Sequence, residues 1–233
     1  MNATILGNRV GMLFCAVVFT AHANLTLLAD DEVQAFVRKI YTHGFPYSKA
    51  KELNRNSVGA LLEMLRDPAD KPYWVNIVSA LGIIGDEKAV EPLIAFLERD
   101  VRGEVDSRTV SAFVEVPRAL GHIAGNGSKK ALTYLLENAT LESWGRKNLP
   151  WTYGDKPGTA VFATGLYTSV IVSLGISAQP GAIARLEGMK KDSSLHSDYR
   201  GAANEALELA DDINKEGRLK VFSAPRRPPR AGK

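Results

Sequence analysis

Apolar residues recur three and four positions apart along most of the chain, the spacing that gathers them on one face of an α-helix. Residues 89–97 are a clear example, because Ala89, Val90, Leu93, Ile94 and Leu97 form one stripe between polar positions. A helix of this kind cannot bury its stripe alone, so each must pack against a neighbour. The pattern predicts an all-α protein. Similar stripes lie at Ala131, Leu132, Leu135 and Leu136, and at Ile183, Leu186 and Met189.

Three segments of the chain align with one another: residues 78–98, 117–137 and 171–191. Each contains a Leu-Gly pair and then a second apolar stripe. The first two Leu-Gly pairs lie about 40 residues apart, which is the period of two-helix repeats. The next interval is longer, which predicts an insertion at about residues 141–159. We therefore expect one domain over residues 24–222, an α-solenoid of stacked antiparallel helix pairs.

Two segments carry a repeat signature. Residues 80–93 read Ala-Leu-Gly-x-x-Gly-Asp-x-x-Ala-Val-x-Pro-Leu, and residues 200–207 read Arg-x-Ala-Ala-x-x-Ala-Leu. Both resemble HEAT-like repeats, of the short type also found in phycobilisome lyases, and the resemblance covers about residues 56–213. It implies a HEAT/armadillo-like superhelix whose usual role is to hold another macromolecule. It carries no catalytic residue over to this chain, and the third unit lacks the second glycine of the pattern.

The glycine-containing segment "GIIGDEK" at residues 82–88 raises the question of phosphate binding, because glycine-rich turns before a helix can bind anions. A Walker loop, however, follows a strand and ends in Gly-Lys-Ser/Thr, and neither feature is present. Asp86 would also repel an anion. We therefore expect Gly85 to end one helix with a positive φ and Asp86 to cap the next helix.

The first 23 residues have the order of a secretory signal peptide: Arg9, the apolar run "VGMLFCAVVFT", and small residues at Ala21 and Ala23. The run is shorter than the roughly 20 residues that a membrane-spanning helix needs. We expect cleavage near Ala23 and export to the periplasm or the medium. The alternatives are an N-terminal helix of the folded domain and a retained membrane anchor. Cys15 is the only cysteine, so no disulfide would support the exported chain.

The basic residues behind the formal charge of +3 are concentrated at the two ends of the chain. One is Arg9, and four more lie in the proline-rich segment of residues 223–233. Without these five the charge falls from +3 to −2, which argues against a nucleic-acid-binding surface. The segment of residues 223–233 is expected to be a disordered basic tail, because it is rich in proline and has no apolar run.

The sequence shows no set of residues that typically carries catalysis. The histidines are His43, His122 and His196 besides one in the signal segment, and they have neither the spacing nor the cysteine partners of a zinc site. The nucleophile-elbow pattern G-x-S-x-G is absent as well. We predict that the protein is not an enzyme and that it holds no metal or other cofactor.

The expected insertion contains the residue types that are enriched in binding hot spots: Trp144, Arg146, Lys147, Trp151 and Tyr153. Long segments without periodicity are uncommon in compact domains and are often functional. In one interpretation, these five residues bind a partner protein. In the other, the tryptophans fill a gap in the core at the point where the insertion breaks the register of the repeat.

These features together predict a non-catalytic, exported scaffold that holds another protein and does not insert stably into a membrane. One alternative is an accessory, lyase-like protein that assists covalent modification of a partner. Another is a structural protein of the cell envelope whose basic tail contacts an anionic surface. The identity of the partner and the oligomeric state stay open at this point.

Overall fold

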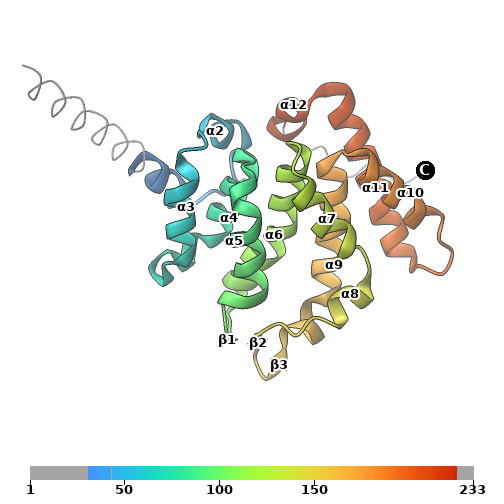
Figure 1. Cartoon of the computed structure of the whole chain (residues 1–233), viewed down its shortest axis with the longest axis horizontal. Helices are drawn as coiled ribbons and strands as arrows, with labels where there is room; N and C mark the ends of the chain where they lie inside the picture. The colour runs from blue at the N-terminus through green and yellow to red at the C-terminus, as the bar shows by residue number, and fades with distance from the viewer. Residues whose placement is uncertain (1–30, 43, 225–233) are drawn as a thin grey trace, which may run out of the picture.

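The computed structural model describes residues 31–42 and 44–224 of the chain. Helices stack in two layers, which confirms the all-α, HEAT-like solenoid (Figure 1). In the first layer, each helix packs on the next one in chain order, and the second-layer helices pack on the first layer. The first layer comprises α4 (Trp74–Ile84), α6 (Ser107–Gly125), α9 (Gly158–Ser177) and α11 (Ser197–Glu216). The second comprises α3 (Ser57–Arg66), α5 (Val90–Ala95) with the π-helix η3 (Phe96–Asp100), α7 (Lys129–Glu137) and α10 (Pro180–Lys191).

The repeated Leu-Gly pairs mark close contacts between neighbouring first-layer helices. A Cβ atom added to Gly121 would lie 2.6 Å from the carbonyl oxygen of Ser173, and one added to Gly175 would lie 2.5 Å from that of Ala206. A Cβ atom on Gly82 would overlap the backbone of Ala119 in the same way. The glycines therefore recur because only a residue without a side chain lets adjacent helices approach this closely.

The segment "GIIGDEK" is a turn between helices, as predicted. Gly85 ends α4 in the left-handed region, with φ at 76°, and the Asp86 side chain accepts a hydrogen bond from the backbone N–H of Lys88. That cap begins the 3₁₀ helix η2 (Glu87–Ala89), which leads into α5. In the third unit, where the second glycine is missing, Ala178 takes the left-handed conformation instead, with φ at 51°.

The insertion contains α8 (Leu141–Gly145) and the strands β2 (Trp151–Tyr153) and β3 (Lys156–Pro157). These strands join β1 (Gly103–Glu104), which lies between η3 and α6, in a sheet of order β1-β2-β3. Strand β2 runs parallel to β1 and antiparallel to β3. The insertion is therefore tied to the connection that leads from the first unit to the second.

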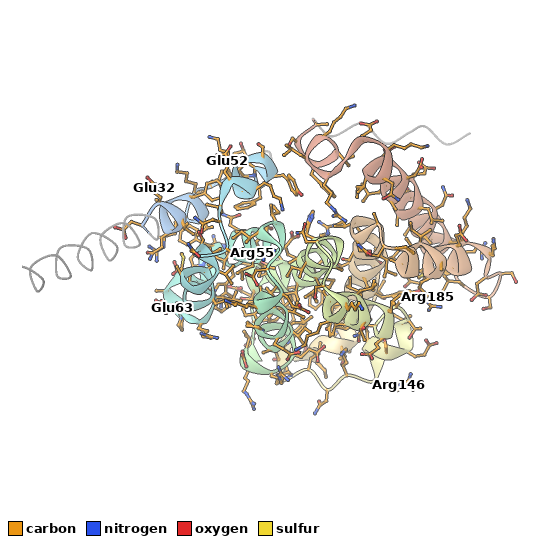
Figure 2. All side chains as sticks on the ribbon, turned by 45° about the horizontal axis from the view of Figure 1, so that its top comes forward. Glu32, Glu52, Arg55, Glu63, Arg146 and Arg185 are labelled. Atoms are coloured by element: carbon orange, nitrogen blue, oxygen red, sulfur yellow. The ribbon has the colours of Figure 1, made fainter. Side chains whose placement is uncertain are left out.

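Elements near the two ends of the described chain meet at one edge of the stack. Residues 31–37 are helical, and α2 (Tyr47–Glu52) and the 3₁₀ helix η1 (Pro68–Tyr73) precede α4. The last helix, α12 (Arg218–Ser223), packs against α2 at the edge that Figure 2 brings forward. The expected signal peptide of residues 1–23 and residues 225–233 of the expected tail lie outside the described residues.

Within the described part of the chain, α9 alone is long and apolar enough to cross a membrane by length and composition, with a mean hydropathy of 1.7. Half of the residues in its apolar stretch are buried inside the structure, where α9 packs between α6 and α11. The core helix of a stacked domain can have this length and composition as well. The absence of stable membrane insertion remains a prediction.

Candidate functional site

The two tryptophans of the insertion lie in the interior of the protein. Trp151 is 1% exposed, its ring packs on Phe113 with a centroid distance of 4.7 Å, and it covers Gly158, where a Cβ atom would collide with the indole. Trp144 is fully buried, and its Nε1 donates a 3.0 Å hydrogen bond to the carbonyl oxygen of Asn138. Both side chains fill the space between repeats, and a partner that binds the folded chain would not reach them.

The insertion is fastened to the π-helix η3. Trp151 Nε1 donates a 3.0 Å hydrogen bond to the Leu97 carbonyl oxygen. Lys147 Nζ lies 2.7 Å from Glu98 Oε1, and the Tyr134 hydroxyl donates a 2.6 Å hydrogen bond to the same oxygen. Burial, together with the adjacent Glu98, raises the pKa of Tyr134 well above its usual value, so this hydroxyl stays a donor. Lys147 of the insertion and Tyr134 of α7 therefore converge on Glu98.

Tyr153 and Arg146 lie at the surface of the insertion. Tyr153 is 38% exposed and packs edge-on against Phe162. Arg146 is exposed, and its Nε donates a hydrogen bond to the Glu142 carbonyl oxygen in its own helix. Lys147 is held by Glu98 and is only partly accessible. A partner contact at the insertion therefore depends on Arg146, Lys147 and Tyr153, and stays a prediction.

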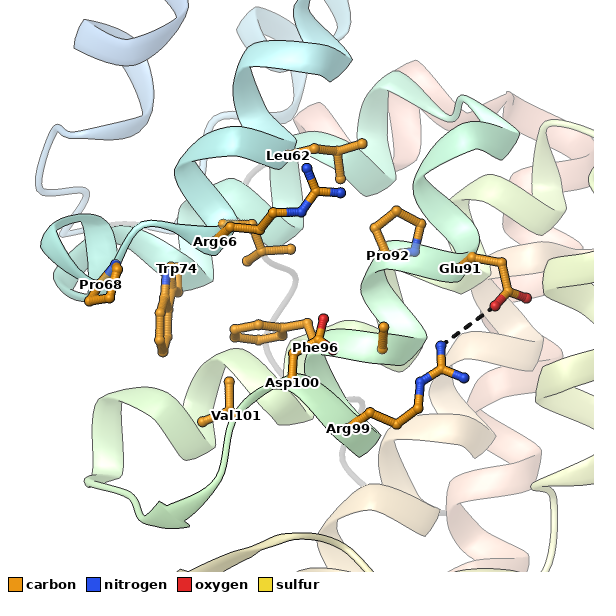
Figure 3. Close-up of a pocket in the computed structure, with 12 residues that line it drawn as sticks. Leu62, Arg66, Pro68, Trp74, Glu91, Pro92, Phe96, Arg99, Asp100 and Val101 are labelled. Carbon is orange, nitrogen blue, oxygen red and sulfur yellow. Dashed lines mark ion pairs between the residues drawn. The ribbon is translucent and has the colours of Figure 1, made fainter.

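A pocket of about 600 Å³ lies between the C-terminal end of α3, the start of α4 and the α5–η3 segment (Figure 3). We call it the Trp74 pocket. Its volume is within the usual range for ligand-binding sites. Apolar groups dominate the lining, with charged side chains at the edge. The lining comprises Leu62, Leu65, Pro68, Trp74, Pro92, Ala95, Phe96 and Val101, with Arg66, Glu91, Arg99 and Asp100.

One buried polar atom at the Trp74 pocket is unsatisfied. Trp74 packs edge-on against Phe96, with ring centroids 5.0 Å apart, and is 7% exposed. Its Nε1 is buried and has no hydrogen-bond partner in the described part of the chain. The indole N–H groups of Trp144 and Trp151 are both paired. Buried donors normally are paired, so Trp74 is an exception that calls for a ligand or a water.

The two arginines of the Trp74 pocket have unused hydrogen-bonding capacity. Arg66 forms no ion pair with any residue that the structure describes. Arg99 lies 3.7 Å from Glu91, but Glu91 lies closer to Lys130, at 2.9 Å. The hydrogen bond from Lys130 is the main reason why the pKa of Glu91 is lowered. Figure 3 shows the Arg66 and Arg99 side chains reaching from α3 and η3 on different sides of the pocket.

The two described histidines lie in different surroundings, His122 in the interior and His196 at the surface. The His122 ring packs against Tyr47 and Phe222, and burial, followed by the positive charges of Arg218 and Lys51, lowers its pKa to about 3. His196 is the exposed cap of α11, beside Asp198. His43 lies outside the described residues. Among residues 31–42 and 44–224, no group of three His, Cys, Asp or Glu side chains could hold a metal ion.

The Trp74 pocket is not predicted by the pattern of the sequence. Trp74 follows the break that Pro68 and Pro72 make in the helical pattern. Tryptophan is enriched in binding sites, and this residue type is the one signal that could have indicated the pocket. The opposite wall depends on the change from α-helix to π-helix at Phe96, which apolar spacing does not reveal. Such changes in helix type are frequent at functional sites.

Residues 75–99 match the PBS lyase HEAT-like repeat. The matched segment runs from α4 through the Gly85 turn and α5 into η3, so it is one complete helix pair. Together with the two-layer stack, the match supports a HEAT-like repeat protein. No curated protein matches the chain by sequence. The matched segment also contains Glu91, Pro92, Phe96 and Arg99 of the Trp74 pocket.

Proposed function

We propose that this protein is a non-catalytic, exported scaffold that holds another protein. HEAT-like repeats generally mediate contacts between proteins, because their stacked helices present a long surface to one partner. The observation that carries the proposal is the open, mostly apolar Trp74 pocket, one wall of which belongs to the segment that matches a HEAT-like repeat. An apolar pocket with polar groups at its edge is a typical binding site.

Export is the part of the proposal that rests on residues 1–23 alone. The order of Arg9, a short apolar run and Ala21-His22-Ala23 supports it. Expression of the complete chain in a host that recognises such signals, followed by cell fractionation and sequencing of the N-terminus, tests it. A mature protein that begins at Asn24 outside the cytoplasm is expected. A chain that stays intact in the cytoplasm would contradict export.

Partner binding is tested by capture from the exported fraction of the native host. The full mature chain is immobilised, and captured proteins are compared with those on a variant in which Ala95→Leu partly fills the Trp74 pocket. We expect to capture at least one protein that binds the native chain at a fixed molar ratio and that binds the Ala95→Leu variant more weakly. A second variant, Arg146→Gln with Tyr153→Ser, tests the surface of the insertion. If neither surface retains a protein above background, the scaffold function is wrong.

The match to a lyase-associated repeat favours one second candidate, an accessory role in the covalent modification of a partner. The match names the repeat and does not identify a catalytic residue in this chain. A solution of free tetrapyrrole titrated with the protein tests this candidate by its absorbance spectrum. A spectrum that does not change with added protein would exclude direct handling of such a group.

A further inference from the structure

We propose that the Trp74 pocket docks a short segment of a partner protein, which inserts one large apolar side chain and places a carboxylate between Arg66 and Arg99. The proposal deepens the proposed function and rests on it, because a docking pocket requires that the chain holds another protein. It goes further by assigning a site and the chemistry of the segment that fits it.

The apolar part of the pocket has the shape and the chemistry for a side chain. Trp74 and Phe96 form an aromatic wall, and Leu62, Pro92 and Ala95 lie around it. The volume of about 600 Å³ exceeds what a single water or ion needs. Burial of an aromatic or branched aliphatic side chain against these groups would remove apolar surface from water on both partners.

The unpaired Trp74 Nε1–H favours a ligand that has a hydrogen-bond acceptor next to the inserted apolar side chain. A peptide segment always carries backbone carbonyl groups next to its side chains, so an inserted residue brings an acceptor to the same place. A purely hydrocarbon ligand would leave the indole donor unsatisfied. The paired indoles of Trp144 and Trp151 show that this chain otherwise satisfies its buried tryptophans.

The charged edge favours one carboxylate and disfavours a polyanion. Arg66 and Arg99 are the available donors, and a guanidinium group binds a carboxylate in a two-point geometry. Asp100, which forms no ion pair with the described residues, and Glu91, which lies 3.7 Å from Arg99, also line the pocket, so the edge carries two acidic groups beside its two arginines. A nucleic acid, which needs many basic groups in a row, fits this edge poorly. An acidic residue next to an apolar residue in a protein segment fits it well.

Selection from a library of random linear peptides tests the chemistry of the pocket directly, because it requires no identified partner. The probe is a phage-displayed library, and the target is the immobilised full mature chain. The most enriched peptide is then synthesised, and its dissociation constant is measured by fluorescence anisotropy. We expect enriched peptides to carry Phe, Trp, Leu or Ile with Asp or Glu within a few positions.

Variants of the protein assign the binding to the pocket. Arg66→Gln and Arg99→Gln should each weaken the selected peptide by about tenfold, since each removes a charge-assisted hydrogen bond. Ala95→Leu keeps a strong helix former and should weaken binding by at least as much by occupying the pocket. Arg55→Gln, at an exposed arginine that precedes α3 and does not line the pocket, is the matched control and should leave the affinity unchanged. Thermal melting of every variant separates lost binding from lost folding.

Each contrary result has a distinct meaning. Peptides that bind the native chain and Ala95→Leu equally would overturn the pocket as the site. If those peptides instead depend on Arg146 or Tyr153, the scaffold function stands and the pocket inference fails. Enriched peptides that are basic would overturn the carboxylate. If no peptide is enriched over the uncoated surface, the pocket inference is wrong, while the capture experiment decides the scaffold function separately.

Discussion

The indole N–H of Trp151 donates a 3.0 Å hydrogen bond to the carbonyl oxygen of Leu97, which lies in the π-helix that ends the first complete helix pair. The two residues belong to different units of the stack, and the insertion that carries Trp151 reaches across to join them. The strand pairing between β1 and β2 lies beside this bond and adds a second connection. The insertion therefore holds neighbouring repeats together.

Replacement of Trp151 by alanine should destabilise the protein strongly. The change removes a fully buried indole, leaves a cavity beside Phe113 and leaves the Leu97 carbonyl without its partner. Large-to-small changes of this kind cost about 3–5 kcal/mol. Chemical denaturation measured by circular dichroism gives the free energy of unfolding.

Two controls separate the contributions of Trp151. Trp151→Phe keeps a large ring but loses the hydrogen bond, so it should cost less than the alanine variant. Tyr153→Ser lies at the exposed end of the same strand and should change the free energy by less than about 1 kcal/mol. A Trp151→Ala protein as stable as the native one would show that the insertion does not join the repeats.

Gly121→Ala tests the reason for the recurring Leu-Gly pair. The added Cβ would lie 2.6 Å from the Ser173 carbonyl oxygen, so α6 and α9 would have to move apart, at a cost of about 1–3 kcal/mol. Gly165→Ala is the matched control, since Gly165 lies within α9 and has no neighbouring atom within 4 Å of an added Cβ. That variant should gain roughly 0.5–1 kcal/mol from helix propensity. Melting curves that shift in the same direction for both variants would contradict this explanation.

Ala178→Gly should stabilise the protein slightly. Ala178 holds φ at 51°, a conformation that costs an ordinary residue about 1–2 kcal/mol. Glycine removes that cost, but it loses more backbone conformational entropy on folding. The net gain in the free energy of unfolding is therefore about 0.5 kcal/mol. Ala184→Gly, in the exposed middle of α10, is the control and should lose about 1 kcal/mol instead. If Ala178→Gly destabilises the protein as much as the control does, the left-handed turn at Ala178 is not strained.

The sequence predicts those parts of the fold that depend on local spacing. The stripe with Val90, Leu93 and Leu97 is buried, and the turn at Gly85 and Asp86 has the expected φ and cap. The role of Gly82 could not be predicted, because it depends on how closely α6 approaches.

The candidate site was less predictable than the fold. The sheet that anchors the insertion pairs strands far apart in sequence, and no local pattern indicates such pairing. The burial of Trp144 and Trp151 could not be predicted from a local pattern either, because it depends on the space between helices that are far apart in the sequence. The Trp74 pocket was not predicted because its walls come from three separate segments, one of which includes a π-helix.

The stability should fall in mild acid because of His122. Its pKa is about 3 in the folded chain and about 6.5 in an unfolded chain, so the unfolded state binds the extra proton first as the pH falls. The contribution of His122 to stability is therefore complete above pH ~6.5 and is lost as the pH falls toward ~3, by at most about 1.4 kcal/mol per pH unit. Glu115 acts in the opposite direction, because burial raises its pKa.

The comparison of native protein with His122→Gln isolates this effect. Both proteins contain Glu115 and all other titrating groups, so the difference between their stabilities at each pH reports His122 alone. Urea unfolding at pH 7 and pH 5 should show that the native chain loses up to about 2 kcal/mol more than the variant does. Parallel curves for the native chain and His122→Gln would mean that His122 titrates in the folded protein as it does in water, and that α12 does not shield it.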